Sequence, residues 1–278
     1  MNRFISPLRF ILVGDFFCYT ILMIKQREVQ KNSLSIFCWN IANPSIERAN
    51  KQAEWLFKRG EDVFVLTETK NSKGCLFMED FFKKNDYTVV FVKPEGKEYG
   101  VMIVSRHKLE PTNFYNLDDN LKSRVASGKI FLNNKSLEII GTYIPSRDKS
   151  FDKIKRKKKF IENIGKSFQS YSDYSNVIFC GDLNILEPCH IPHYHFFEKW
   201  EYDFYNSLMN YELFDSFRHL NPQKKDYSWV GRTGDGYRYD HCFVSKDLLP
   251  FVKECYYLHN PRNERLSDHS AIIIKLSL

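Results

Sequence analysis

The chain has 278 residues, of which 43% are hydrophobic and 16% aromatic, so it is long enough for one large domain or two small ones with a substantial core. Lys and Arg number 41 against 34 Asp and Glu, and the net charge of +7 is a mild basic bias. That bias suits a polyanionic partner such as nucleic acid, but a solvated basic surface explains it equally well. The composition therefore excludes a chain without a core and does not by itself select a partner.

Residues 1–30 are expected to form an extension outside the fold. The apolar stretch Phe10–Ile24 resembles the core of a signal peptide, but Asp15 interrupts it and no small-residue cleavage site follows. It is also too short and too interrupted to predict a membrane span. A start of translation at Met23, just before the first predicted strand, is slightly favoured.

Strands and helices are predicted to alternate along residues 31–278. Spacings near 3.6 predict helices, as in 45–59, where Ile46, Ala49 and Leu56 recur on one face. In chain order the predicted elements are strand 34–39, helix 45–59, strand 62–67, helix 74–85, strands 87–92, 99–105 and 136–143, helix 150–170, strand 176–181, helix 197–210, a short helical or turn segment near 213–220, and strands 226–230, 239–245 and 271–276. With no Gly/Ser linker, this order predicts one α/β domain in which two mixed sheets pack together and helices lie outside.

The cysteines predict a reduced, cytoplasmic protein. Their odd number, the absence of a Cys-x-x-Cys pair and their placement in apolar strands indicate buried thiols. The seven are Cys18, Cys38, Cys75, Cys180, Cys189, Cys242 and Cys255. The segment Cys189–His195 has the residue types to bind a soft metal, but a metal-free loop is favoured because no second ligand cluster stands at a zinc-site spacing.

Six predicted apolar strands have a polar group at one end. The groups are Trp39-Asn40, Thr67-Glu68-Thr69, Gly141-Thr142-Tyr143, Gly181-Asp182-Leu183-Asn184, Tyr239-Asp240-His241 and Ser267-Asp268-His269. Each group alone is common as a turn or a helix cap. All of them together predict a metal-assisted active site that is assembled from strand ends.

The residue types assign a chemistry to that site. The oxygen ligands of Glu68 and Asp268, with Asn40 nearby, suit Mg²⁺ and also Mn²⁺. A metal held there can polarise a phosphoryl oxygen. His269, held by Asp240, is predicted to stabilise an oxyanion on phosphorus. Tyr143 is predicted to donate its hydroxyl to a phosphate oxygen. Asp182 orients or deprotonates the attacking water, and Asn184 positions it.

The basic run Lys153–Lys159 opens the predicted helix 150–170. It suits contact with a phosphate backbone, but a solvated helix face is favoured because charge runs on helices are usually exposed.

The motifs resemble the endonuclease/exonuclease/phosphatase superfamily, and within it the exonuclease III and AP-endonuclease branch. The resemblance covers about residues 33–278 and rests on Cys38-Trp39-Asn40-Ile41, Leu66-Thr67-Glu68, Tyr99–Ser105, Gly141–Pro145, Gly181–Ile185, Asp215–Leu220, Tyr227-Ser228-Trp229, Arg238-Tyr239-Asp240 and Ser267-Asp268-His269. It implies a four-layer, DNase I-like α/β sandwich and Mg²⁺-dependent hydrolysis of phosphodiesters. It also implies that Glu68 is the main metal ligand, with Asn40 and Asp268 close by. Tyr143 favours the exonuclease III branch, because phosphatase and DNase I-like relatives usually have histidine there.

Two positions depart from the family pattern. Ala42 stands where AP endonucleases often have an acidic residue, and the loop 230–239, which probes DNA in those enzymes, is short here. Arg218 and the aromatic residues Trp229, Tyr237 and Tyr239 are predicted to bind substrate. The aromatic rings suit stacking on a sugar or base, although packing around the strand end is an equal alternative.

The sequence thus supports a Mg²⁺-dependent nuclease that acts on DNA, expected to be double-stranded, as an AP endonuclease, a 3′-exonuclease or both. The role predicted is DNA repair, with no obligate protein partner and no membrane. One rival, favoured by Ala42 and the short loop, is a phosphoesterase of the same fold acting on RNA, a nucleotide or a small phosphoester. A second rival, a non-catalytic nucleic-acid-binding module, is disfavoured by the full set of acidic and imidazole residues.

Overall fold

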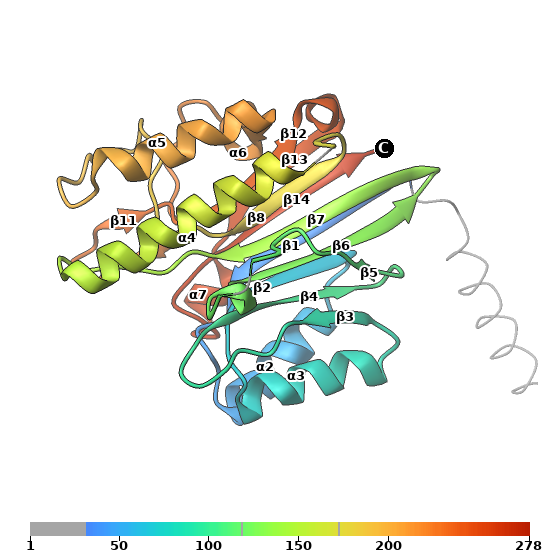
Figure 1. Cartoon of the computed structure of the whole chain (residues 1–278). Coiled ribbons are helices and arrows are strands. Elements are labelled where there is room, and N and C mark those ends of the chain that lie inside the picture. The colour runs from blue at the N-terminus through green and yellow to red at the C-terminus, as the bar shows by residue number, and fades with distance from the viewer. Residues whose placement is uncertain (1–31, 118, 172) are drawn as a thin grey trace, which may run out of the picture. The chain divides into compact units, whose positions relative to one another are not determined.

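Two six-stranded sheets form the described part of the unit 33–278 (Figure 1). The computed structural model describes residues 32–117, 119–171 and 173–278, and the chain divides into the units 1–32 and 33–278. The first sheet has the order β13-β14-β1-β2-β4-β3 and the second the order β5-β6-β7-β8-β12-β9. Both sheets are mixed, because β1 and β2 pair in parallel in the first and β7 and β8 in the second.

The strands have the following bounds. The first sheet contains β1 (Ser33–Asn40), β2 (Val63–Thr69), β3 (Thr88–Phe91), β4 (Gly100–Ser105), β13 (Val252–Leu258) and β14 (Ala271–Ser277). The second contains β5 (Glu110–Pro111), β6 (Val125–Leu132), β7 (Lys135–Tyr143), β8 (Val177–Asp182), β9 (Leu213–Asp215) and β12 (Asp240–Ser245). A separate small hairpin is formed by β10 (Trp229–Val230) and β11 (Gly236–Tyr237).

Helices begin where the sequence supplies caps. The α-helices are α2 (Ile46–Phe57), α3 (Lys73–Lys84), α4 (Phe151–Ser170), α5 (Lys199–Ser207), α6 (Ser216–Leu220) and α7 (Asn260–Asn263), and the 3₁₀ turns are η1 (Lys122–Arg124), η2 (Leu208–Tyr211) and η3 (Lys246–Phe251). The hydroxyl of Ser45 accepts from the N–H of Arg48 at the start of α2, and that of Ser72 accepts from Cys75 at the start of α3. Each hydroxyl satisfies one of the free N–H groups of a first helical turn.

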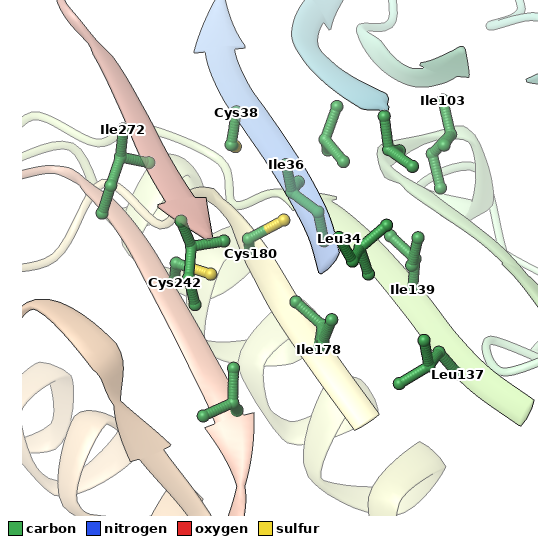
Figure 2. Packing of buried hydrophobic residues seen from close by; sticks show 14 of the residues in the cluster. Leu34, Ile36, Cys38, Ile103, Leu137, Ile139, Ile178, Cys180, Cys242 and Ile272 are labelled. Carbon is green, nitrogen blue, oxygen red and sulfur yellow. The ribbon is translucent and has the colours of Figure 1, made fainter. Parts of the chain in front are cut away.

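Three separate apolar clusters divide the domain into four layers. Alternate residues of β1 face opposite ways: Leu34, Ile36 and Cys38 point between the sheets, whereas Phe37 and Trp39 pack toward α2 and α3. In Figure 2, Leu34, Ile36 and Cys38 converge with residues of the second sheet, among them Ile178, Cys180 and Cys242. The third cluster joins the outer face of the second sheet to α4 and α5 (Figure 1). This helix–sheet–sheet–helix order confirms the predicted four-layer α/β sandwich.

Strand direction brings the polar strand ends to one edge. Because β7 and β8 are parallel, Tyr143 and Asp182 end side by side in register, and Asn40 likewise pairs with Thr67 across β1 and β2. The antiparallel strand β12 starts at this same edge, with Asp240 opposite Asp182. Strand β14 runs antiparallel to β1, so the segment just before Ala271 also reaches this edge.

Several predicted elements differ from those observed. Strands β6 and β13 were not predicted from the sequence, and the predicted strand 226–230 reduces to Trp229–Val230. The predicted extension 1–30 and the start at Met23 lie outside the described residues. Among the described residues, no helix is both long enough and apolar enough to cross a membrane.

Candidate active site

Asn40 joins the two sheets at the predicted edge. Its fully buried side-chain amide donates to Oε2 of Glu68 and to Oδ2 of Asp182, both at 2.9 Å. Glu68 belongs to the first sheet and Asp182 to the second. One amide group therefore fixes the separation of two carboxylates that come from different sheets.

The backbone of Glu68 has an uncommon conformation. Its φ of +57° lies in the left-handed region, and the pairing of β2 with β4 shifts register between Leu66 and Thr69. Such an irregularity re-aims a side chain out of the strand pattern, and residues in that region cluster at functional sites. The Tyr143 hydroxyl donates to Oε2 of Glu68 at 3.0 Å. Burial, then the charges of Glu68 and Asp182, raise the pKa of Tyr143 well above its usual range, so this hydroxyl remains a donor.

Asp182, Asp240 and His269 form a buried cluster. The imidazole Nδ1 of His269 lies 2.7 Å from Oδ2 of Asp240, and its Nε2 lies 4.0 Å from Oδ2 of Asp182. Burial and then the charge of Asp240 raise the pKa of Asp182, whereas the His269 charge opposes that change. Burial lowers the pKa of His269, but the Asp240 carboxylate outweighs it and raises that pKa overall. His269 is therefore an imidazolium held by Asp240, and it lies next to Asp182, whose carboxyl group takes up a proton more readily than usual.

Two serine hydroxyls, whose roles the sequence did not reveal, clamp the strand ends. Ser267 donates to the main-chain oxygen of Asn40 at 2.6 Å and accepts from the N–H of His269 at 3.2 Å. Ser228 accepts from the N–H groups of Tyr239 and Asp240, each at 3.0 Å. Ser267 stands in the motif with His269, but nothing in the Tyr227-Ser228-Trp229 motif marks Ser228 as a clamp. Together the hydroxyls fix the backbone on both sides of the Asp240–His269 pair.

The donor set fits a divalent cation. One atom each of Asp182, Asp240 and His269 lies within 4.8 Å of the others; the two carboxyl groups can attract a cation, whereas the charged His269 cannot ligate one. Within the part of the chain that the structure describes, Oδ1 of Asp240 is buried and accepts no hydrogen bond. Such an atom is costly unless an ion or a water completes its shell. The Glu68 carboxylate is connected to the same group through Asn40, so the edge is rich in the oxygen ligands that hard cations take.

Asp268 and Asn184 occupy different positions relative to this cluster. Asp268 is exposed, and its Oδ2 accepts from Nε1 of Trp229 at 2.9 Å. Asn184 has a φ of +48°, its N–H donates to Asp182 at 2.9 Å, and its amide donates to the oxygen of Ile144 at 3.0 Å. The structure thus brings Asn40, Glu68 and Asn184 to Asp182 and holds Asp268 at the rim.

An aromatic stack borders the cluster. The rings of Tyr237 and Tyr239 stack at 5.1 Å, and Trp229 lies 5.5 Å from Tyr237 and 6.0 Å from Tyr239. Tyr194, which the sequence did not single out, extends the stack at 4.4 Å from Tyr237. It comes from the loop 188–198, whose mixture of His, Tyr and Phe carries no motif. The predicted rings therefore pack on one another, as the packing alternative expects, while they remain half-buried beside the catalytic cluster.

Arg218 is bound within the protein. Its guanidinium donates to both oxygens of Glu187 at 2.5 Å, and Nη1 donates to the main-chain oxygens of Asn221 and Lys224 at 2.8 Å. These contacts use its fork of donors. Its predicted role in substrate binding stays a prediction.

A basic hollow lies beside Tyr143. The ring of Tyr99 meets Tyr143 edge-on at 5.7 Å and lines a hollow of about 560 Å³. The basic residues of its wall are Lys93, Lys97, Lys122 and Arg156, and its acidic residues are Glu95, Glu98 and Asp119. Ion pairs use charges of both signs, because Glu98 pairs with Arg124 and Arg156 and Lys93 pairs with Glu79, so the wall has only a slight excess of basic residues.

Comparisons with known proteins agree with the observed fold. A model of the endonuclease/exonuclease/phosphatase family matches residues 37–269. A DNA-(apurinic or apyrimidinic site) endonuclease of Dictyostelium discoideum is 24% identical over 249 residues, which are 83% of this chain and 67% of that protein. An AP endonuclease structure from Archaeoglobus fulgidus superposes with a TM-score of 0.76 at 23% identity, covering 88% of this chain and 100% of that one. A 3′-5′ exonuclease from Neisseria meningitidis gives 0.75 at 22% identity, covering 87% and 99%.

Proposed function

The chain belongs to the endonuclease/exonuclease/phosphatase family, and from this membership we propose that it is a Mg²⁺-dependent nuclease that hydrolyses phosphodiesters of double-stranded DNA. The observation that carries the proposal is the cluster of Asp182, Asp240 and His269, which Asn40 links to Glu68. Each of these groups has a task in phosphodiester hydrolysis, and all of them reach one edge.

The proton chemistry follows from the local environment. Asp182 is buried, its pKa is raised, and it is thereby suited to take a proton from an attacking water. Hydrogen bonds from Asn184 to Asp182 and to the main-chain oxygen of Ile144 hold this residue in place, and it orients that water. His269, kept charged by Asp240, donates from Nε2 to a phosphoryl oxygen as negative charge develops there. The Tyr143 hydroxyl is a second donor to the phosphate.

Mg²⁺ is the ion proposed, with Mn²⁺ as a substitute. Glu68 would hold it together with waters, the Asn40 amide would steady the Glu68 carboxylate, and Asp268 would approach the ion from the rim. When bound, such an ion polarises a phosphoryl oxygen and stabilises the leaving alkoxide.

DNA is proposed as the substrate on two grounds. Relatives whose names state a substrate or a reaction include an apurinic-site endonuclease, an AP endonuclease and a 3′-5′ exonuclease. The site also has a basic hollow on its Tyr99 side and a rim of aromatic rings on its Trp229 side. These features suit a phosphate backbone and a sugar or base. We include a role in DNA repair in the proposal, and the predicted cytoplasmic location stays a prediction.

A second candidate is a phosphoesterase of the same fold that acts on RNA or a small phosphoester. Ala42 favours it, because this position adds no carboxylate beside Asn40; only its N–H contacts Oδ1 of Asn40, at 2.9 Å. A site with less negative charge binds its metal less tightly.

One substrate panel separates the candidates. Purified protein is incubated with Mg²⁺, Mn²⁺ or a chelator and with an abasic-site duplex, a duplex with a recessed 3′ end, single-stranded RNA or a small chromogenic phosphodiester. The proposal expects metal-dependent cleavage of a duplex substrate. Cleavage of RNA or the small ester with both duplexes intact would replace it by the second candidate. No cleavage with any metal would favour a non-catalytic module.

A further inference from the structure

The basic run 153–159 has one member that does not face solvent. Lys157 is 1% exposed, whereas Lys153, Lys155, Arg156 and Lys159 are exposed. A buried ammonium group is costly unless it is paired and hydrogen-bonded. Lys157 meets both conditions, because Nζ donates to Oε1 of Glu201 at 2.6 Å and to the main-chain oxygen of Asn184 at 2.6 Å.

The contact with Glu201 accounts for the pairing of Lys157. Glu201 is 0% exposed and also accepts from Arg147, so the carboxylate bridges two cations behind the second sheet. Burial lowers the pKa of Lys157 to about 8, and Glu201 opposes that effect. The ion pair alone would be a structural feature of α4 and α5.

The contact with Asn184 reaches the active site. Asn184 has a φ of +48°, which is uncommon for a residue other than glycine and needs external contacts to persist. Its N–H, its amide and its main-chain oxygen are bound by Asp182, Ile144 and Lys157 respectively. Two of these three contacts involve ionisable groups, the Asp182 carboxyl and the Lys157 ammonium, and charge-assisted hydrogen bonds are the stronger ones; Lys157 is the one that holds the main-chain oxygen.

We infer that Lys157 is a positioning residue for the reaction, and that its ammonium group holds the left-handed backbone of Asn184 so that this side chain faces the water next to Asp182. This inference rests on the proposed function. Lys157 acts through Asn184 and touches neither substrate nor metal. It also gives a role to one residue of a run that otherwise forms a solvated helix face.

The test replaces Lys157 by methionine, which keeps the side-chain length and removes the charge. Lys158→Met is the matched control, because Lys158 is the next residue and packs over the Trp200 ring at 5.1 Å. Two quantities are measured: kcat and KM on the duplex substrate, and the NMR signals of the Asn184 side-chain amide. Lys157→Met is expected to lower kcat about 100-fold with KM within about threefold, since a displacement of about 1 Å can cost that much. It should also shift the Asn184 signals, and Lys158→Met should do neither.

A Lys157→Met protein with wild-type kcat, or with unshifted Asn184 signals, would overturn the inference. Arg147→Met separates positioning from stability, because it removes the second cation of Glu201 and leaves both contacts of Lys157 in place. It should lower the midpoint of thermal unfolding and keep kcat within about threefold; a loss of kcat as large as that of Lys157→Met would show that any damage to this buried ion cluster lowers turnover, and would overturn the inference.

Two further results also test the inference: the behaviour of a substitute variant, and the absence of activity in the wild type. If Lys157→Met does not fold, Lys157→Arg takes its place: the guanidinium is too large to reproduce both 2.6 Å contacts, so kcat should fall and the Asn184 signals should shift. Wild-type behaviour of that variant would overturn the inference. If the wild type itself cleaves no substrate, the proposed function fails, and the Asn184 signals alone decide whether Lys157 positions Asn184.

Discussion

Two clusters of buried charge include residues on or near strands β8 and β12, and the pKa values of their carboxyl groups shift in opposite directions. In the catalytic cluster, Asp182 and Asp240 share one imidazole, and the pKa of Asp182 is raised. In the second cluster, Glu187 and Asp215 face Arg238, and Arg218 adds a further contact to Glu187. Burial would raise the pKa of Glu187, but the arginines outweigh it and lower that pKa to about 2.

The two clusters differ in the number of cations that face their carboxyl groups. Two arginines face Glu187 and Asp215, whereas one imidazole faces the two aspartates of the catalytic cluster. Arg238 is fully buried and lies 2.6 Å from Glu187 and 2.7 Å from Asp215. The two arginines balance the charges of Glu187 and Asp215, and these ion pairs contribute stability. In the catalytic cluster one imidazole faces two carboxyl groups, and among the described residues no hydrogen bond reaches the buried Oδ1 of Asp240; a nearby cation would offset this negative charge. We therefore expect the first cluster to serve the proposed reaction and the second to stabilise the fold.

The largest expected effect is on turnover. His269→Asn removes the charged donor of the catalytic cluster and should lower kcat about 10³-fold, the scale seen when one donor to a developing oxyanion is lost. The free energy of unfolding should also fall, but by less than for the loss of Arg238, because one buried carboxylate and not two loses a cation. The control is His259→Asn, because His259 also pairs with an aspartate, Asp226, at 3.1 Å but lies outside the cluster. Steady-state kinetics on the abasic duplex checks both, and an active His269→Asn protein would remove His269 from the mechanism.

The second cluster should show the reverse pattern. Arg238→Met leaves Asp215 buried without its arginine and Glu187 with Arg218 alone, so the free energy of unfolding should fall by about 3–5 kcal/mol at pH 7. Denaturant titration measures this change. Lys275→Met is the control, because its ion pair with Glu254 is exposed and should contribute about 1 kcal/mol or less. An unchanged denaturation midpoint in Arg238→Met would show that the second cluster does not stabilise the fold.

The pH dependence of stability follows from the lowered pKa of Glu187. Its stabilising contribution is complete above the unfolded pKa near 4.5 and is lost as pH falls toward about 2. The contribution is on the order of 3 kcal/mol. Glu187→Gln should therefore be less stable than the wild type at pH 7, and the gap should close between about pH 5 and 2. A gap that is constant over that range would contradict the assignment.

The smallest expected effect concerns the rim. Trp229→Phe removes the hydrogen bond to Asp268 and should raise the Mg²⁺ concentration for half-maximal activity about threefold, as expected for one exposed hydrogen bond. Trp200→Phe is matched, since its Nε1 also donates to an exposed carboxylate, Glu198, at 3.0 Å. Equal metal dependence in both variants would mean that Asp268 needs no support from Trp229.

Sequence patterns predicted most of the fold because apolar strands and capped helices are local features. Strand β6 was missed because Gly128 and small residues interrupt its pattern; a Cβ at Gly128 would lie 2.8 Å from Leu109. Strand β13 was missed because its buried residues, Val252, Cys255 and Tyr257, do not alternate evenly: the pairing with β14 shifts register between Val252 and Glu254.

The site was predicted through its chemistry-bearing residues, and the contacts between them were not. Lys157 belongs to a basic run that predicts exposure and Arg218 to a motif that predicts substrate binding, whereas the structure pairs them with Glu201 and Glu187 from distant segments. No local pattern reports such long-range pairings. The same holds for Trp229, which reaches Asp268 across 39 positions of sequence.

Asp182→Asn tests the contrast between the clusters most directly, because it keeps the shape and removes the charge. Since the pKa of Asp182 is raised in the fold, its ionised form costs stability above that pKa, and this cost disappears in the variant. At pH 8 the variant should unfold with a free energy no lower than that of the wild type, while kcat on the abasic duplex falls about 10³-fold. Turnover within about threefold of the wild type, or a loss of stability together with turnover, would contradict the account.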